Sequence, residues 1–395
     1  MTALAHGGVG RRIAYYRSVV RPKMTQKQLA AAACVALGTI RKIERGERGV
    51  TDATLEAIAD ALGVDPARLR TDRGSAHTRV HDALPALSDA IAAYDGPDDG
   101  PVRPLHDLRT AVVEAARWRL AAQYTRIARQ LPDLLMELAR AYQTAPAVER
   151  AEIAGLLVRA YRSADAVAYK FGARDLSARL IELMRWAAPE AADPLLTASV
   201  AYVRTETFFA ARAHGPGLRA LEMALAAAPL PRTAMEIAVR GALHMRAAVI
   251  AGRAHDVSAA VSHLSEAGVL ANQVPEGVYY GTAFGPDSLR IHEVSVAVSL
   301  GDDHTARALD VAGEWKPPAD LPAERRSGFY IELARAQLWS GLADDSFESL
   351  KVARRIAPQH TREHPWVRED AATLRRLKRA DSETLTSFAE WCAAT

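Results

Sequence analysis

Basic side chains gather in the first fifty residues of this chain of 395 residues. That segment holds ten Lys or Arg against two Glu, a local charge of +8, whereas the whole chain carries +3 and the rest therefore −5. Such a surface attracts phosphate groups, and its binding to a polyanion should weaken steeply with salt. The alternative is a solvated basic face without a partner. The ten residues are Arg11, Arg12, Arg17, Arg21, Lys23, Lys27, Arg41, Lys42, Arg45 and Arg48.

Two short helices joined by a tight break are predicted between Met24 and Gly46. Thr25 is a favoured N-cap for a helix that starts at Gln26, and Gly46 ends a second helix over about residues 36–45. Two isoleucines of the second helix, three residues apart, point inward, and its polar residues point elsewhere. The inward pair is Ile40 and Ile43; the polar set is Thr39, Arg41, Lys42 and Arg45.

Amphipathic patterns predict a helix over residues 9–20 and another that opens at Thr51 or Asp52 and ends at Gly63. Four or five short helices would therefore close a small core within the first 70 residues.

This segment resembles the phage-repressor type (XRE family) of helix-turn-helix over roughly residues 9–70. The resemblance rests on TQKQLA at 25–30, on Ile40 and Ile43 followed by Glu44 and Gly46, and on TLEAIADALGV at 54–64. It implies that Gln26 and Lys27 touch the phosphate backbone of DNA and that residues 36–42 face base edges. It also implies a structural bridge between Arg17 and Glu44.

The first turn of the groove-facing helix, Ala36-Leu37-Gly38, offers no side-chain donor. Arg41 or Lys42 could read guanine and Leu37 could contact a thymine methyl, but DNA shape should supply more of the selectivity than in a typical member. We therefore expect DNA contacts from Gln26, Lys27, Leu37, Thr39, Arg41, Lys42, Arg45 and Arg48.

Length and composition limit which fold classes the whole chain can adopt. With 49% hydrophobic and 25% charged residues over 395 positions, a globular protein of two domains is expected. The lack of a signal peptide pattern and of a long apolar run predicts a cytoplasmic protein. We expect a helix-turn-helix domain over residues 1–73, a connecting helix and linker over 74–104, and a sensor and dimerisation domain over 105–395.

No residue set predicts catalysis or a cofactor, so we expect no enzyme and no metal. Cys34 and Cys392 lack metal or redox spacing, and Cys34, in the turn, is interpreted as a small buried filler rather than a thiol sensor. Two histidine pairs lie four residues apart, but nothing completes a metal site, and solvated histidines are the favoured reading. These pairs are His77 with His81 and His360 with His364.

Helical hairpins repeat through the second half. Gly172 to Pro189, Gly301 to Pro318 and Gly341 to Pro358 share one spacing, with helix patterns before and after each Gly. The positions resemble a tetratricopeptide repeat (TPR), with weaker copies expected to turn at Gly215 and Gly252. The predicted fold class is all-α: a five-helix N-terminal domain followed by a TPR-like solenoid, right-handed and with a concave face.

One segment, residues 272–286, is too long and too rich in Gly and Pro for a simple turn between helices. With the helix after it, this segment resembles one found in actinomycete regulators that join a helix-turn-helix to a TPR-like half. Two hypotheses remain open for it: a ligand or peptide pocket, or a loop that caps the core. The pocket would be lined by Tyr279, Tyr280, Phe284 and His292.

Together these patterns predict a transcriptional regulator that binds double-stranded DNA as a homodimer and senses a small-molecule or peptide effector. Resemblance to peptide-sensing regulators of Gram-positive bacteria implies the dimer. The rival hypothesis is a TPR scaffold or adaptor with vestigial DNA binding, and no membrane partner is expected.

Overall fold

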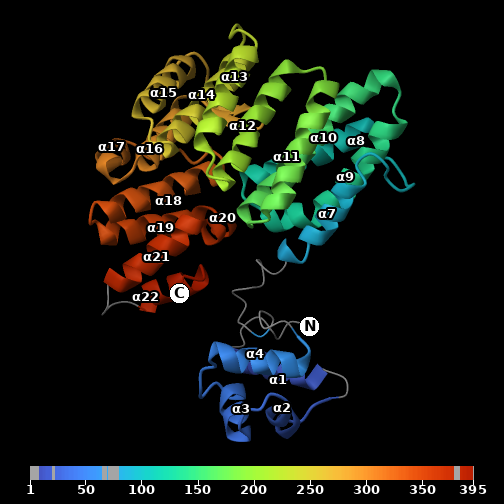
Figure 1. Cartoon of the computed structure of the whole chain (residues 1–395), viewed down its shortest axis with the longest axis vertical. Helices are drawn as coiled ribbons and strands as arrows, with labels where there is room; N and C mark the ends of the chain where they lie inside the picture. The colour runs from blue at the N-terminus through green and yellow to red at the C-terminus, as the bar shows by residue number, and fades with distance from the viewer. Residues whose placement is uncertain (1–8, 20–22, 65–68, 70–79, 378–382, 395) are drawn as a thin grey trace. The chain divides into compact units, whose positions relative to one another are not determined.

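The computed structural model describes residues 9–19, 23–64, 69, 80–377 and 383–394. It divides into two compact units, Met1–Asp82 and Ala83–Thr395. In the described residues both units are helical, apart from one short β-hairpin in the second (Figure 1). The predicted all-α class is confirmed.

Four helices of the first unit surround one apolar core. The core is built from side chains that the helical periodicity places inward, among them Leu29, Ile40, Ile43 and Ile58, all nearly inaccessible to solvent. The helices are α1 (Val9–Val19), α2 (Gln26–Ala32), α3 (Leu37–Glu44) and α4 (Asp52–Leu62). Thr51, one of the two predicted starts, caps α4, and Gly63, in the left-handed conformation, ends it as predicted.

Six antiparallel helix pairs follow one another through the second unit, and the two helices of each pair pack together (Figure 1). The pairs are α8 (Leu105–Leu120) with α9 (Tyr124–Thr144), α10 (Ala147–Lys170) with α11 (Arg174–Glu190), α12 (Pro194–Ala210) with α13 (His214–Ala227), α14 (Ala234–Arg253) with α15 (Val257–Ala271), α16 (Pro286–Leu300) with α17 (Thr305–Glu314), and α18 (Ala323–Trp339) with α19 (Ala343–Ile356). The remaining helical elements are α7 (Leu84–Ala92), η2 (Asp302–His304), α20 (Pro358–Glu363), α21 (Pro365–Leu377) and α22 (Glu383–Trp391).

The helix α7 lies in the region that the sequence assigns to a connecting helix and linker. It packs on α9 and buries Leu87, Ala90 and Ile91, because its apolar residues recur at i, i+3 and i+4. Residues 84–92 thus belong to the compact second unit.

The turns inside five of the six pairs, all except α16 with α17, share one hydrogen-bond pattern, and different residues take the left-handed position. At the end of α10, Gly172 has φ 75° and the N–H of Ala173 donates to the carbonyl of Ala168. The predicted turns at Gly215 and Gly252 are wrong. The left-handed positions there are Arg212 (φ 54°) and His255 (φ 58°).

Glycine has a packing role at one of the two mispredicted sites. Gly215 lies inside α13. Gly252 lies inside α14, and a Cβ added to it would lie 3.0 Å from the Cβ of Ser299 on α16. The missing side chain therefore lets two neighbouring repeats approach each other.

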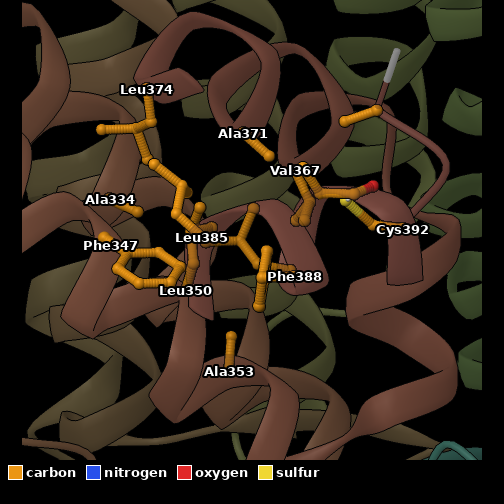
Figure 2. Close-up of a cluster of buried hydrophobic side chains, with 13 residues drawn as sticks. Ala334, Phe347, Leu350, Ala353, Val367, Ala371, Leu374, Leu385, Phe388 and Cys392 are labelled. Atoms are coloured by element: carbon orange, nitrogen blue, oxygen red, sulfur yellow. Dashed lines mark hydrogen bonds between the residues drawn. The ribbon is translucent and has the colours of Figure 1, made fainter. Parts of the chain in front are cut away.

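The last helices close over a further apolar cluster drawn from α18, α19, α21 and α22 (Figure 2). The rings of Phe347 and Phe388 meet edge to face at 5.6 Å. Cys392 is completely buried in this cluster, and burial raises the pKa of its thiol to about 11. It therefore acts as a small apolar side chain here.

Residues 277–284 form a β-hairpin that the sequence does not predict. The strands β1 (Gly277–Tyr279) and β2 (Thr282–Phe284) pair in antiparallel fashion, with Tyr279 opposite Thr282. Tyr280 (φ 47°) and Gly281 (φ 74°) make the two-residue turn, whose positive φ angles suit a tight hairpin. In the described part of the chain no helix is both long and apolar enough to span a bilayer.

Candidate functional site

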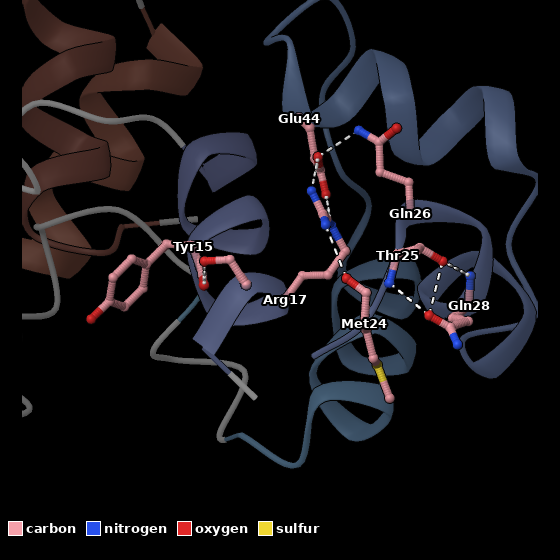
Figure 3. Close-up of polar contacts among 8 residues, drawn as sticks. Tyr15, Arg17, Met24, Thr25, Gln26, Gln28 and Glu44 are labelled. Carbon is pink, nitrogen blue, oxygen red and sulfur yellow. Dashed lines mark hydrogen bonds and ion pairs between the residues drawn. The ribbon is translucent and has the colours of Figure 1, made fainter. Parts of the chain in front are cut away.

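The helix α2 begins at a reciprocal cap. The backbone N–H of Gln28 donates to Thr25 Oγ1 at 3.2 Å, and the N–H of Thr25 donates to Gln28 Oε1 at 2.8 Å (Figure 3). This capping box satisfies two backbone donors that the first helical turn leaves open. The predicted N-cap at Thr25 is confirmed.

The break between α2 and α3 is a left-handed turn at Cys34, with φ 52°. The N–H of Val35 donates to the carbonyl of Ala30 at 2.9 Å, which closes the end of α2 as a glycine usually does. Because this backbone position points its side chain outward, Cys34 is exposed. The interpretation of Cys34 as buried filler is therefore wrong.

The helix α3 is held from its inner face and ends at Gly46. Ile40 and Ile43 are buried, as predicted. The N–H of Gly46 donates to the carbonyl of Ile43 and the N–H of Glu47 to that of Lys42, each at 2.9 Å. These two bonds form the C-terminal cap in which glycine takes the left-handed conformation.

The helix α1 crosses α3 at Gly10. A Cβ on Gly10 would lie 1.8 Å from the carbonyl oxygen of Ile43, so no side chain fits between the two backbones. This close crossing fixes the inner face of α3 against α1 and leaves its opposite face free.

A polar cluster ties α1, α2 and α3 together (Figure 3). Arg17 donates from Nε to Glu44 Oε1 at 2.7 Å and from Nη2 to Glu44 Oε2 at 2.9 Å. Both side chains are largely covered, and the hydrogen bond to Glu44 raises the pKa of Arg17. The geometry agrees with the bridge that the resemblance implies.

The amide of Gln26 joins the same cluster. Its Nε2 donates to Glu44 Oε2 at 2.7 Å, and its side chain is half-buried. Sequence reasoning expects this side chain at a phosphate, whereas in the structure its amide is engaged inside the domain. Lys27, the next residue, is exposed and carries no ion pair with any described residue.

The outer face of α3 is a stripe at positions 38, 41, 42 and 45, the spacing of one side of a helix. Gly38, Arg41, Lys42 and Arg45 are all exposed. Arg45 pairs with Glu47, which is also exposed, at 3.0 Å, and solvent weakens this ion pair. We call these four residues the α3 stripe; it presents cationic donors beside a glycine that permits close approach.

The other residues expected to contact DNA are either partly buried or lie outside α3. Leu37 is half-buried and packs against the core of the first unit, and Thr39 is also half-buried. Arg48 is exposed in the segment after α3. The structure therefore brings Arg41, Lys42 and Arg45 together and turns Leu37 partly inward.

The four residues expected to line an effector pocket do not share one environment. Phe284 is fully buried, and its ring fills the space above Gly241, where a Cβ would lie 1.9 Å from Phe284 Cζ. His292 is also buried; its Nδ1 lies 2.8 Å from the carbonyl of Ser288, and burial lowers its pKa to about 3. These two side chains are part of the core.

The two tyrosines of the hairpin are partly exposed. The hydroxyl of Tyr279 donates to the carbonyl of Pro275 at 2.8 Å, and that of Tyr280 lies 3.3 Å from Asp193 Oδ1. Burial and the nearby Asp193 raise the pKa of Tyr280 to about 12. The segment therefore combines a core-capping role, through Phe284, with a half-exposed tip.

Among the described residues no group of three His, Cys, Asp or Glu side chains that could hold a metal ion occurs. His360 is buried rather than solvated, which corrects the sequence interpretation, and His364 is half-buried. Burial lowers the pKa of both. His77 lies outside the described residues.

Sequence reasoning missed a group of arginines inside the second unit. Arg119 is 7% exposed and follows Leu108, Val112 and Ala115 at helical spacing. An arginine that continues an apolar stripe is the signal that could have revealed it.

Comparisons with known proteins identify the first unit. Residues 21–69 match the family model described as helix-turn-helix. No curated protein matches the chain. Among solved structures, the chain is similar to Bacillus thuringiensis PlcR in complex with the peptide PapR7 and DNA, with 13% identity and a TM-score of 0.28 over 67% of this chain and 94% of that one.

Proposed function

We propose that this chain, whose residues 21–69 are a helix-turn-helix domain, is a DNA-binding transcriptional regulator. The observation that carries the proposal is the α3 stripe. It holds three exposed cationic side chains on a helix whose other face is fixed by buried Ile40 and Ile43. A helix presented in this way fits the major groove, where arginine and lysine donate to guanine and to phosphates.

Recognition would depend on a short set of donors. Arg41 and Lys42 are the candidates for base contacts, and Lys27 and Arg48 for phosphate contacts. Gly38 lets the helix approach the groove closely but reads nothing itself. Much of the selectivity should then come from the shape and flexibility of the DNA.

A homodimer would provide the footprint that one such helix lacks. Paired half-sites about one helical turn apart, roughly 34 Å, double the contact area and make the operator palindromic. We propose that the second unit supplies the dimer contacts and senses an effector in the cytoplasm. A ligand would act by shifting the population between two arrangements of the paired domains.

Selection from a random duplex pool, followed by anisotropy titration of the selected sequence, tests this function. We expect enrichment of a palindromic site and a preference over scrambled duplex of at least about a hundredfold. Arg41→Ala should reduce that preference. Equal and weak binding of all duplexes would instead support the alternative, a scaffold with vestigial DNA binding. The stretch Ala36-Leu37-Gly38 at the start of α3, which has no side-chain donor, favours that alternative.

A further inference from the structure

Three arginines from three different repeats meet at one phenol in the second unit. Arg325 on α18 donates from Nη2 to the hydroxyl of Tyr202 on α12 at 2.8 Å. The guanidinium carbon of Arg246 on α14 lies 4.8 Å from the Tyr202 ring centroid, and that of Arg162 on α10 lies 5.9 Å away. Tyr202 itself is buried.

A fourth arginine adjoins this group at the tip of the β-hairpin. Arg119 Nη2 donates to the carbonyl of Gly281 at 2.7 Å, and Arg162 Nη1 donates to the preceding carbonyl, that of Tyr280. Arg162 Nη2 also donates to Thr282 Oγ1 at 2.6 Å. We call Arg119, Arg162, Arg246 and Arg325 the interior arginine cluster.

Only one member of this cluster has a direct ion pair with a carboxylate among the described residues. Glu206 pairs with Arg246 at 3.6 Å, and Glu324 pairs with Lys170 at 3.2 Å. Within the described part of the chain, Arg119, Arg162 and Arg325 have no carboxylate at ion-pair distance.

Despite its burial, the charges of Lys170, His360, Arg119 and Arg325 lower the pKa of Glu324 to about 2, so this carboxylate supplies one nearby negative charge. Two other buried acids supply less. Burial raises the pKa of Asp165 well above its usual value, and burial also raises that of Glu332. In both cases burial disfavours the charged form. Their hydrogen bonds join them to serines, Asp165 to Ser177 and Glu332 to Ser295.

Two further observations indicate an unmet need for an acceptor. The Nε of Arg119 is buried and has no hydrogen-bond partner among the described residues. Burial, and then the charges of Arg119 and Arg325, lower the pKa of Arg162 to about 9. Like charges held together in a partly dry environment repel, and a bound anion would relieve that repulsion.

We propose that the interior arginine cluster binds an oxyanion, the carboxylate or phosphate group of an effector. The planar guanidinium group suits both, because its parallel N–H donors match two oxygens of either anion. Arg162, Arg246 and Arg325 are partly exposed, so a ligand can reach them. This inference rests on the proposed sensing role of the second unit and names the chemistry of its ligand.

Binding would couple to the hairpin. Arg119 and Arg162 now donate to the carbonyls of Gly281 and Tyr280. An oxyanion that accepts those donors competes with the turn, so the tip at Tyr280 should move when the ligand binds. The position of the half-exposed hairpin would therefore depend on whether an anion is bound at the interior arginine cluster.

Calorimetric titration of the full chain with inorganic pyrophosphate and, separately, with citrate tests the proposal at constant ionic strength. We expect saturable binding of at least one of them, weakened by at least about tenfold in Arg162→Gln and in Arg325→Gln. The matched control is Arg129→Gln, an exposed residue of α9 without an ion pair in the described structure, which should bind as the wild type does.

The two probes distinguish the sources of the anion. Binding of pyrophosphate but not of citrate indicates a phosphate ligand, and binding of citrate but not of pyrophosphate indicates a carboxylate ligand. If neither binds to the wild type, or if both cluster variants bind as tightly as Arg129→Gln, the proposal is wrong. Arg119→Gln replaces any variant that loses its helical circular dichroism. Because these titrations contain no DNA, their failure leaves the proposed DNA binding untouched.

Discussion

Arg17 and Glu44 form a two-pronged ion pair that joins α1 to the end of α3, with N–O distances of 2.7 and 2.9 Å. Arg17 also donates from Nη1 to the carbonyl of Met24 at 3.1 Å, just before the N-cap of α2. One guanidinium therefore connects the three helices whose arrangement determines which face of α3 is exposed. The α3 stripe depends on this contact even though neither residue belongs to it.

Removing the charge of Glu44 should unfold the first unit selectively. Glu44→Gln keeps the shape but leaves the largely covered Arg17 without its counter-charge, at a cost of about 2 kcal/mol. All six Trp lie in the second unit. Urea unfolding followed by circular dichroism should therefore show an earlier first transition while the Trp fluorescence midpoint stays fixed. Glu47→Gln, at an exposed pair, is the control and should change neither signal.

Gly10→Ala should destabilise the first unit through its backbone. The new methyl group would meet the Ile43 carbonyl at 1.8 Å, and separating α1 from α3 should cost about 2 kcal/mol or more. Gly38→Ala, where no atom lies within 4 Å, should be neutral or should stabilise α3 by up to about 1 kcal/mol. Thermal melts of the two variants compare them directly; equal melting temperatures would show that the helices do not cross this closely.

Phe284→Ala should weaken the second unit rather than only an effector response. The ring is completely buried against Gly241, so its removal leaves a cavity and should cost about 3–5 kcal/mol. Tyr280→Phe, which removes one long hydrogen bond at the half-exposed tip, should change the Trp-detected urea midpoint little. A wild-type midpoint in Phe284→Ala would mean that this ring lies outside the core.

Acid should destabilise the second unit through His360. Its Nε2 lies 3.0 Å from Lys170 Nζ, and its Nδ1 lies 2.7 Å from Ser327 Oγ, which itself donates to the Glu324 carbonyl. The neutral ring accepts from Lys170 and donates to Ser327. Burial and then Lys170 lower its pKa to about 3.

In the unfolded chain His360 has the ordinary histidine pKa of about 6.5, so it binds a proton at a higher pH than in the native state. The free energy of unfolding is therefore greatest above about pH 6.5 and decreases as the pH falls from there towards 3. We expect a loss of about 1 kcal/mol per pH unit from His360 in this window. Trp-detected urea midpoints at several pH values measure it, and His360→Gln should flatten the curve where His106→Gln, at an exposed site, does not. A midpoint that rises on acidification would contradict this account.

The helix-turn-helix was readable from the sequence because its signals are local. The cap at Thr25, the inward pair Ile40 and Ile43 and the stop at Gly46 each depend on neighbours within one turn. The state of Gln26 was not readable, because its partner Glu44 lies 18 positions away.

The repeat was readable as a pattern but not at each turn. Arg212, His255 and Cys34 occupy left-handed positions where glycine is the usual signal, and the surrounding backbone bonds stabilise them there. The burial of Phe284 depends on Gly241, a contact between distant parts of the chain that periodicity does not encode.

The most direct test of the account is the salt dependence of duplex binding by the chain and by a variant of its basic surface. Lys27, Arg41 and Lys42 are changed together to Ala; the control changes Arg126, Arg129 and Arg174, exposed residues of the second unit, and removes the same charge. The account predicts that the first variant binds the selected duplex at least about a hundredfold more weakly and that its log–log salt slope is shallower by about two to three. Unchanged affinity and slope in that variant, or an equal loss in the control, would contradict it.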